Sequence, residues 1–275
     1  MEILQYQFMQ NAVLAGILAG IGCSLIGVLV VTLEIPFLGV AMSHAGFAGA
    51  ILGIIIGVNP FVCAFIFCCL ASLFIGPITD KADLKPEVAV GILFSIMLGL
   101  AFLFLAFLPG AKTEALSVMW GSILTVSRFD VWVIAVSALV VISFLIIFFR
   151  QIKTVLFSRQ VAASLGIPER SIYYAIIFLS GVVISSNLTT IGGLLIFSLV
   201  VNPAAAAFQI AYSFRNMCIL ASIFGVSSCL LGLWFSYIFN VPAGAVIIVS
   251  SSMIFLVCLL LSPKKKLRRL CCRLE

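Results

Sequence analysis

Long apolar runs alternate with short polar breaks along the chain. An α-helix crosses the hydrocarbon core of a bilayer with about 20 apolar residues, and nine runs approach that length. They lie at 12–33, 38–57, 60–79, 88–108, 130–149, 172–191, 193–211, 216–239 and 244–262. Helix-breaking or polar residues separate them, such as Asn59-Pro60, Gly192-Gly193 and the charged loop 79–87. The pattern predicts an all-α, polytopic bundle of about eight or nine membrane-spanning helices.

The composition fits this prediction. Of the 275 residues, 64% are hydrophobic and 9% are charged, and the mean hydropathy is +1.35. A soluble domain carries about 25% charged residues, so the charges here are too few to cover a globule in water. The nine cysteines form no C-x-x-C pair or Cys/His cluster, so we expect neither a disulfide framework nor a zinc site. We expect one membrane domain over residues 1–275, without a cleavable signal peptide.

Basic residues are distributed unevenly between the loops. If the basic tail 263–275 and the loop 150–171 face the cytoplasm, only Lys112 and Arg128 of the 15 basic residues lie outside. The positive-inside rule therefore predicts a cytoplasmic C-terminus and an external N-terminus, although an additional crossing within 109–129 would reverse the early spans. The net charge of +6 requires no nucleic-acid partner, because the tail accounts for most of it and can attract anionic lipid heads.

The second run carries a small residue at every fourth position, Gly49, Gly53 and Gly57 among them. One face of that helix is therefore nearly smooth, and another helix can approach it closely. We expect these three glycines, together with Gly193 at the start of the seventh run, to be packing positions.

His44 is the only histidine of the chain and follows Ser43 beside this face. An ionisable side chain inside a span is a functional hypothesis by default, and imidazole suits transition-metal ions. The alternative is a neutral histidine that is hydrogen-bonded to a neighbouring helix. In the seventh run, Pro203 removes a backbone donor and frees a carbonyl, and Asn202 adds an amide. We expect Ser43, Asn202 and Pro203 to line a translocation path; the alternative for the Asn202-Pro203 pair is a packing kink.

The segment 150–171 is long for so compact a chain. Ser158 is placed to cap a short helix, which Gly166 and Pro168 would end. Val161 and Leu165 are spaced to share one face of it. An apolar helix that projects from the membrane predicts a docking element for a partner; the alternative is a helix that lies on the lipid heads. The chain has no Walker A pattern, so it does not bind ATP by that loop.

Six segments in order resemble the permease subunit of the ABC importers for zinc, manganese or iron. The stretch Gly39 to Ala45 resembles the family's G-D-A-[ILM]-S-H-[AS]. Residues 87–92 resemble the family's acidic-x-x-x-G-I stretch, and residues 120–124 resemble [FW]-G-[DS]-[IL]-L. Residues 155–168 resemble the coupling segment L-F-D-x-x-x-A-x-x-x-G. Residues 193–207 resemble G-x-L-L-x-x-x-L-[LV]-x-x-P-A-A-x-A, and residues 241–244 resemble [TV]-P-[AS]-G. The resemblance as a whole runs from about residue 12 to 262.

The resemblance implies a type II importer-like permease in a prokaryotic inner membrane, working by alternating access and without enzymatic activity of its own. It implies three protein partners: a separate ATPase, an extracytoplasmic metal-binding lipoprotein and a second permease copy. A transported divalent metal is implied, with no resident cofactor. His44 inherits a role in handling the metal. The ATPase would dock on the coupling loop, whose candidate residues are Leu156, Phe157, Arg159, Leu165 and Gly166.

One position departs from the family pattern. Val40 stands where the family has the aspartate of G-D-x-x-S-H, so the carboxylate that would pair with His44 is missing. This leaves a second hypothesis open, in which the same type of permease carries a metal chelate or another small solute. A third hypothesis is an autonomous secondary carrier, with its binding site at the broken seventh span. The scarcity of carboxylates in the spans counts against ion coupling in such a carrier.

Overall fold

The computed structural model describes residues 6–108, 121 and 123–262. Nine helices within these residues are long and apolar enough to cross a membrane, which confirms the predicted bundle. They are α1 (Gln7–Thr32), α2 (Leu38–Ile56), α3 (Pro60–Lys81), α4 (Pro86–Phe107), α6 (Arg128–Ile147), α9 (Glu169–Ile191), α10 (Gly193–Ile210), α11 (Phe214–Phe239) and α12 (Ala243–Leu261). The predicted tail 263–275, and Lys112, Trp120 and Ser122, lie outside the described residues.

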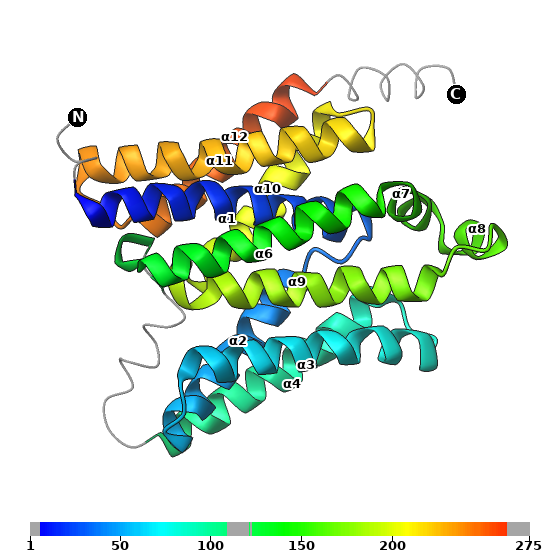
Figure 1. Ribbon diagram of the computed structural model, residues 1–275, viewed down its shortest axis with the longest axis horizontal. Helices are drawn as coiled ribbons and strands as arrows, with labels where there is room; N and C mark the ends of the chain where they lie inside the picture. The colour runs from blue at the N-terminus through cyan, green and yellow to red at the C-terminus, as the bar shows by residue number, and fades with distance from the viewer. Residues whose placement is uncertain (1–5, 109–120, 122, 263–275) are drawn as a thin grey trace.

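The central helices of the bundle are α1 and α9. In Figure 1 the helices follow one another from α11 and α12 at the top, through α1, α6 and α9, to α2, α3 and α4 at the bottom. In the apolar stretches of both α1 and α9, 72% of the residues are buried, against 22% in α4 and 17% in α12. The core therefore follows α1 and α9, while α4 and α12 form its rim.

Local signals explain where the helices begin and end. Asn59 accepts a hydrogen bond from the Phe61 backbone N–H at 2.9 Å, and Pro60 occupies the first position of α3, which suits a residue without a backbone donor. At α6, Ser127 and Asp130 form a capping box, which satisfies two backbone donors that the helix leaves unpaired. A short 3-10 turn, η2 (Ile123–Thr125), precedes α6.

Two short helices project at one end of the bundle, called the α8 end below. They are α7 (Phe149–Phe157) and α8 (Arg159–Ser164), seen at the right of Figure 1. Ser158 accepts a hydrogen bond from the Val161 N–H at 3.3 Å, and Gly166 follows in the left-handed conformation with φ of 73°. The short helix predicted from these residues is therefore present, and α7 is an additional helix that the sequence pattern did not predict.

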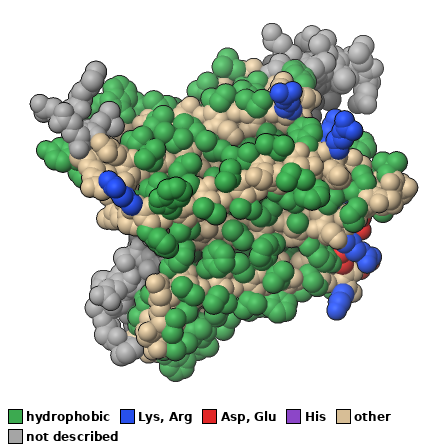
Figure 2. Space-filling model, in the orientation of Figure 1, with side chains coloured by type: hydrophobic (Ala, Val, Ile, Leu, Met, Phe, Trp, Pro, Cys, Tyr) green, Lys and Arg blue, Asp and Glu red, His purple; other side chains and the backbone are tan. Residues whose placement is uncertain are grey.

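Hydrophobic side chains cover the face of the bundle that Figure 2 shows. Charged side chains gather toward its two ends, most of them at the α8 end. This distribution places the apolar belt where hydrocarbon would surround the helices and the charges where the head groups begin.

Candidate functional site

His44 lies on α2 and is half-buried against α4. Its ring meets that of Phe94 edge-on, with ring centres 5.2 Å apart and an angle of 75° between the planes. Its Nδ1 is buried and has no hydrogen-bond partner among the described residues. The alternative, in which the histidine is hydrogen-bonded to a neighbouring helix, therefore finds no support at Nδ1. This nitrogen keeps an unused capacity to form a hydrogen bond or to ligate a metal ion.

Apolar side chains surround His44. Phe37 also packs on Phe94, with ring centres 4.9 Å apart, and Val40 lies one turn before His44 on the same side of α2. Phe37 is 38% exposed and Val40 is half-buried, so this face of the single chain is partly open. We call the surface formed by Phe37, Val40, His44 and Phe94 the α2/α4 face.

No carboxylate compensates for Val40 within the described part of the chain. All described carboxylates stand at helix ends or in turns; they are Glu34, Asp80, Asp83, Glu87, Asp130 and Glu169. No group of three His, Cys, Asp or Glu side chains that could hold a metal ion occurs among the residues searched. A single copy of the chain thus offers a divalent ion one imidazole on the α2/α4 face.

Ser43 does not share the surroundings of His44. Its hydroxyl donates to the Gly39 carbonyl at 2.9 Å and lies 3.4 Å from the Gly193 carbonyl on α10. A Cβ added to Gly193 would lie 3.1 Å from the Ser43 Cβ, so α2 and α10 approach closely here. Successive residues of a helix point about 100° apart, and His44 is accordingly turned to α4 while Ser43 is turned to α10.

Asn202 ties α10 to α12. Its side-chain amide donates to the hydroxyl groups of Ser198, Ser251 and Ser252 at 3.0 to 3.2 Å, and Ser198 and Ser251 are themselves 2.6 Å apart. Such interhelical hydrogen bonds hold membrane helices together. The structure turns Asn202 toward α12 and does not bring it to His44.

Pro203 leaves α10 unbroken. The helix continues from Gly193 to Ile210 with Pro203 inside it, and Pro203 itself is buried. The carbonyl that loses its helical donor is that of Leu199, four residues earlier, and the Ser24 hydroxyl of α1 donates to it at 3.5 Å. The break expected in the seventh span is thus absent, because a neighbouring helix supplies the missing donor.

The smooth face of α2 is shorter than expected. A Cβ on Gly49 would lie 2.5 Å from the Cys63 carbonyl oxygen, and one on Gly53 would lie 3.0 Å from the Pro60 Cα, so both glycines allow α3 to approach. Gly57 would meet nothing within 4 Å. It ends α2 in the left-handed conformation with φ of 76°, so it is a helix cap and not a packing position.

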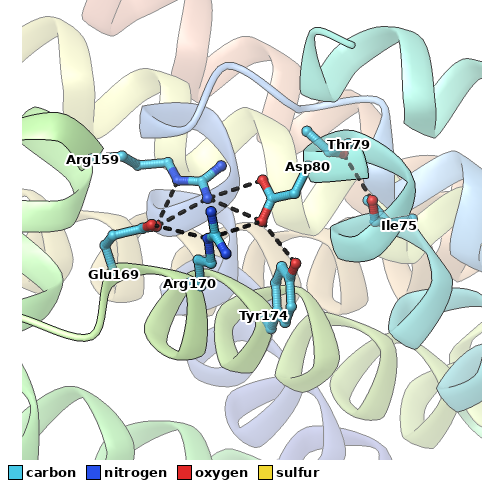
Figure 3. A network of polar contacts seen from close by, with 7 residues as sticks. All are labelled: Ile75, Thr79, Asp80, Arg159, Glu169, Arg170 and Tyr174. Atoms are coloured by element: carbon cyan, nitrogen blue, oxygen red, sulfur yellow. Dashed lines mark hydrogen bonds and ion pairs between the residues drawn. The ribbon is translucent and has the colours of Figure 1, made fainter. Parts of the chain in front are cut away.

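A network of charges ties α8 to α3 and α9 (Figure 3). The Arg159 guanidinium donates to Asp80 at 3.1 Å and to Glu169 at 3.0 Å. The Tyr174 hydroxyl donates to Asp80 at 2.7 Å, and Arg170 lies 3.6 Å from Glu169 and 4.0 Å from Asp80. We call these five residues the Asp80 cluster.

Burial within the Asp80 cluster lowers the pKa of Arg159, but hydrogen bonds and charges from Glu169 and Asp80 outweigh this effect, and the pKa is raised above its ordinary value. The Arg159 guanidinium also lies 4.4 Å from the centre of the Tyr173 ring, a distance typical of a cation–π contact. The arginine is therefore held as a cation on three sides.

The candidate coupling residues divide into an outward and an inward set. Phe157 is 84% exposed and Leu165 is 66% exposed, so they form an apolar projection at the α8 end. Leu156 packs against the core, and Arg159 turns inward to the Asp80 cluster. The sequence suggested Arg159 as a docking residue, but it gave no sign of the partners Asp80 and Glu169, since 79 and 10 residues separate these from Arg159.

Comparisons with known proteins agree on one family. The sequence model of the ABC 3 transport family matches residues 5–262. The manganese transport system membrane protein MntC of Listeria monocytogenes is 31% identical over 265 residues, which are 96% of this chain and 94% of that protein. The manganese import system permease protein ScaB of Streptococcus gordonii is 31% identical over 261 residues, which are 95% of this chain and 94% of that protein.

A solved structure shows the same architecture. PsaBC from Streptococcus pneumoniae in complex with Fab contains a chain that matches with a TM-score of 0.84 and 29% sequence identity, covering 97% of this chain and 96% of that one. Fold and sequence thus agree over nearly the whole length. The chain is a multi-pass membrane protein that belongs to the ABC 3 transport family.

Proposed function

We propose that this chain is the permease subunit of an ABC importer for a divalent transition-metal ion, with manganese as the first candidate. The observation that carries the proposal is the match, over at least 95% of the chain, to relatives named for manganese transport. His44 on the partly open α2/α4 face supports it, because an imidazole with an unused ring nitrogen is a suitable metal ligand.

The proposed assembly contains two copies of the chain. A second copy covers the α2/α4 face, so that two imidazoles approach one path. A separate ATPase docks on the apolar projection of Phe157 and Leu165 at the α8 end, which is the cytoplasmic end with the C-terminus. An extracytoplasmic binding lipoprotein delivers the ion at the opposite end. When the ATPase closes, α8 moves, and the Asp80 cluster transmits this motion to α3 and α9, which both pack on α2.

The chemistry at His44 favours passage over tight retention. Two neutral imidazoles contribute nitrogen ligands but no negative charge, so the ion keeps much of its water and its full charge. Carboxylates and water suit manganese, whereas imidazole also suits iron and zinc. A path with Val40 in place of the family's aspartate should therefore discriminate less between manganese, iron and zinc, and all three ions are candidates.

Uptake by living cells tests this proposal. Cells that lack the gene should take up radioactive manganese more slowly than cells that carry it, and the chain should co-purify with an ATPase and a binding lipoprotein. Competition by unlabelled zinc or iron(II) would rank the three ions. Ion flux through the purified chain alone in liposomes, without ATP, would contradict the ABC mechanism and favour an autonomous carrier.

A second candidate is import of a metal chelate, favoured by the apolar surroundings of His44 and by Val40. A chelated ion has already exchanged its water for ligand atoms, so a path without carboxylates can pass it. Uptake measured with excess chelator distinguishes the two candidates. Uptake that falls with the free-ion concentration supports the ion, and uptake that follows the concentration of the complex supports the chelate.

A further inference from the structure

An apolar groove runs between α6 and α11 at the α8 end of the bundle. Both helices pack closely on α1, while along their described lengths they make few contacts with each other; Figure 1 shows α1 between them. The cavity has a volume of about 420 Å³. Leu25 of α1, which is 7% exposed, belongs to its floor, and Ile146 of α6 and Ile219 of α11 belong to its walls.

The groove opens sideways from the bundle. Ile146 is 71% exposed and Ile219 is 49% exposed, and both belong to helices that span the membrane. Their neighbours in a bilayer are hydrocarbon chains. The groove lies apart from the α2/α4 face, because its lining comes from α1, α6, α7 and α11. An occupant of the groove would therefore leave the proposed contact between two copies free.

A basic side chain borders the groove where the helices reach the head-group level. Arg215, in the first turn of α11, lines the cavity; it is exposed and forms no ion pair with any residue that the structure describes. The Phe149 ring of α7 lies 5.4 Å from the Phe214 ring, which places the start of α7 beside the start of α11. Arg150 thus adds a second exposed cation near this end of the groove.

Charge and shape together identify one kind of occupant. An acyl chain fits between the apolar walls, and a phosphate at head-group level fits an unpaired arginine. Neither α7 nor α11 carries a carboxylate that would repel it. We propose that this groove binds an anionic glycerophospholipid, with one acyl chain over Leu25 and the phosphate at Arg215. Basic pockets between membrane helices bind such head groups elsewhere.

Native mass spectrometry of the full chain tests the site with two lipids of equal chain length, phosphatidylglycerol and phosphatidylethanolamine. Because one basic residue contributes about 1 kcal/mol to the attraction, the chain should retain phosphatidylglycerol about fivefold better. Arg215→Gln should abolish this preference. Lys85→Gln, which removes an exposed cation elsewhere at the same end, should keep it. Ile219→Trp, at the exposed wall, should fill the groove and reduce retention of both lipids.

Three outcomes would overturn the proposal. The first is equal retention of the two lipids by the unmodified chain. The second is an equal loss of preference in Arg215→Gln and Lys85→Gln, which would mean that total charge and not the groove attracts the lipid. The third is crosslinking of a protein helix to Cys218, a groove residue, in native membranes. None of these results bears on metal uptake, so the proposed function can be judged separately.

Discussion

The Asp80 cluster and the surroundings of His44 handle polarity in opposite ways. In the cluster, Asp80 accepts hydrogen bonds from Arg159 and Tyr174, and Glu169 accepts one from Arg159. His44 has apolar neighbours and an Nδ1 without a partner among the described residues. A saturated network fixes one geometry, whereas an unpaired buried atom costs free energy that a ligand can recover. The comparison separates a region whose polar groups are paired from a region with an unpaired polar atom.

Position in the membrane explains the difference. The Asp80 and Arg159 side chains are 17% and 29% exposed and lie at the α8 end, where water reaches the helix ends. His44 lies inside a span, where a permanent charge is costly. A neutral imidazole is therefore a suitable ligand at mid-span, because it becomes part of a charged centre only when an ion is present.

The largest effect is expected from His44→Leu. Manganese uptake should fall at least about tenfold, since loss of even an indirect metal partner commonly costs that much. The melting temperature of the purified chain should stay nearly constant, because His44 Nδ1 makes no hydrogen bond to lose. Uptake by cells and thermal unfolding in detergent measure the two quantities.

Ser95→Ala is a suitable control for His44→Leu. Ser95 lies on α4, like Phe94, but its exposed hydroxyl only donates to the Gly91 carbonyl of its own helix. Its loss should change neither uptake nor melting temperature. Normal manganese uptake in His44→Leu would show that His44 does not bind the transported ion.

The next largest effect is expected from Arg159→Gln. The change leaves Asp80 and Glu169 without their shared cation, and the free energy of unfolding should fall by about 2 kcal/mol, in the range for hydrogen bonds to charged groups. Transport should fall more than ATP hydrolysis in the assembled complex, because α8 would move without carrying α3 along. Denaturation curves and the ratio of ions transported to ATP hydrolysed measure these effects.

Two variants test whether the geometry of Arg159 matters. Arg159→Lys keeps the charge but loses the forked contact with two carboxylates, so it should lie between the unmodified chain and Arg159→Gln in both measurements. Lys85→Gln removes an exposed cation of the same end and should be silent. If transport and hydrolysis fell in parallel in Arg159→Gln, the Asp80 cluster would support the fold without transmitting motion.

The two regions also differ in how far the sequence reveals them. Hydropathy located the nine spans found in the described part of the chain, and Ser158 with Gly166 located α8, because helix length and capping are local properties. His44 stood out because a single ionisable residue in an apolar run is conspicuous. The Asp80 cluster did not stand out, since Arg159 and Asp80 are 79 residues apart and only the packing of α3 against α9 joins them.

For two polar features of α10, a neighbouring helix decides the local structure, and their place on the translocation path stays a prediction. Pro203 marked a broken helix in the sequence, but the Ser24 hydroxyl of α1 reaches the freed Leu199 carbonyl. Asn202 marked a polar path, but serines of α12 take up its amide protons. A polar residue in a span needs a hydrogen-bonding partner, and the sequence alone does not show whether the protein or the transported solute supplies it.

A smaller effect is expected from Val40→Asp. A carboxylate one turn from His44 on the same face would add the charge that the site lacks. The manganese concentration for half-maximal uptake should fall several-fold, about 1 kcal/mol in binding, and the maximal rate should fall with it because the ion leaves more slowly. Val40→Asn introduces a side chain with nearly the shape of aspartate but without its charge. It should leave the half-maximal concentration and the maximal rate unchanged. Equal effects of Asp and Asn would show that charge at this position is irrelevant.

The smallest effect is expected from Tyr174→Phe. The ring should stay in place, because it packs against α3 where Gly76 leaves room for it. Only the hydrogen bond to Asp80 is lost, and the free energy of unfolding should fall by about 1 kcal/mol. Combined with Arg159→Gln, the loss should be less than the sum of the two single losses, since both residues act through Asp80.

Tyr173 provides the matched control for Tyr174→Phe. It is the adjacent residue and 1% exposed, but its hydroxyl makes no hydrogen bond to Asp80, in contrast to the hydroxyl of Tyr174. Tyr173→Phe keeps the ring beneath Arg159 and leaves the hydrogen bonds to the Asp80 carboxylate intact, so it should lower the free energy of unfolding less than Tyr174→Phe does, since hydrogen bonds to charged groups are the stronger ones. A larger loss in Tyr174→Phe than in Tyr173→Phe would show that the hydrogen bond to Asp80, and not aromatic packing alone, stabilises the α8 end. Equal losses would mean that the hydrogen bond from Tyr174 to Asp80 has no special weight.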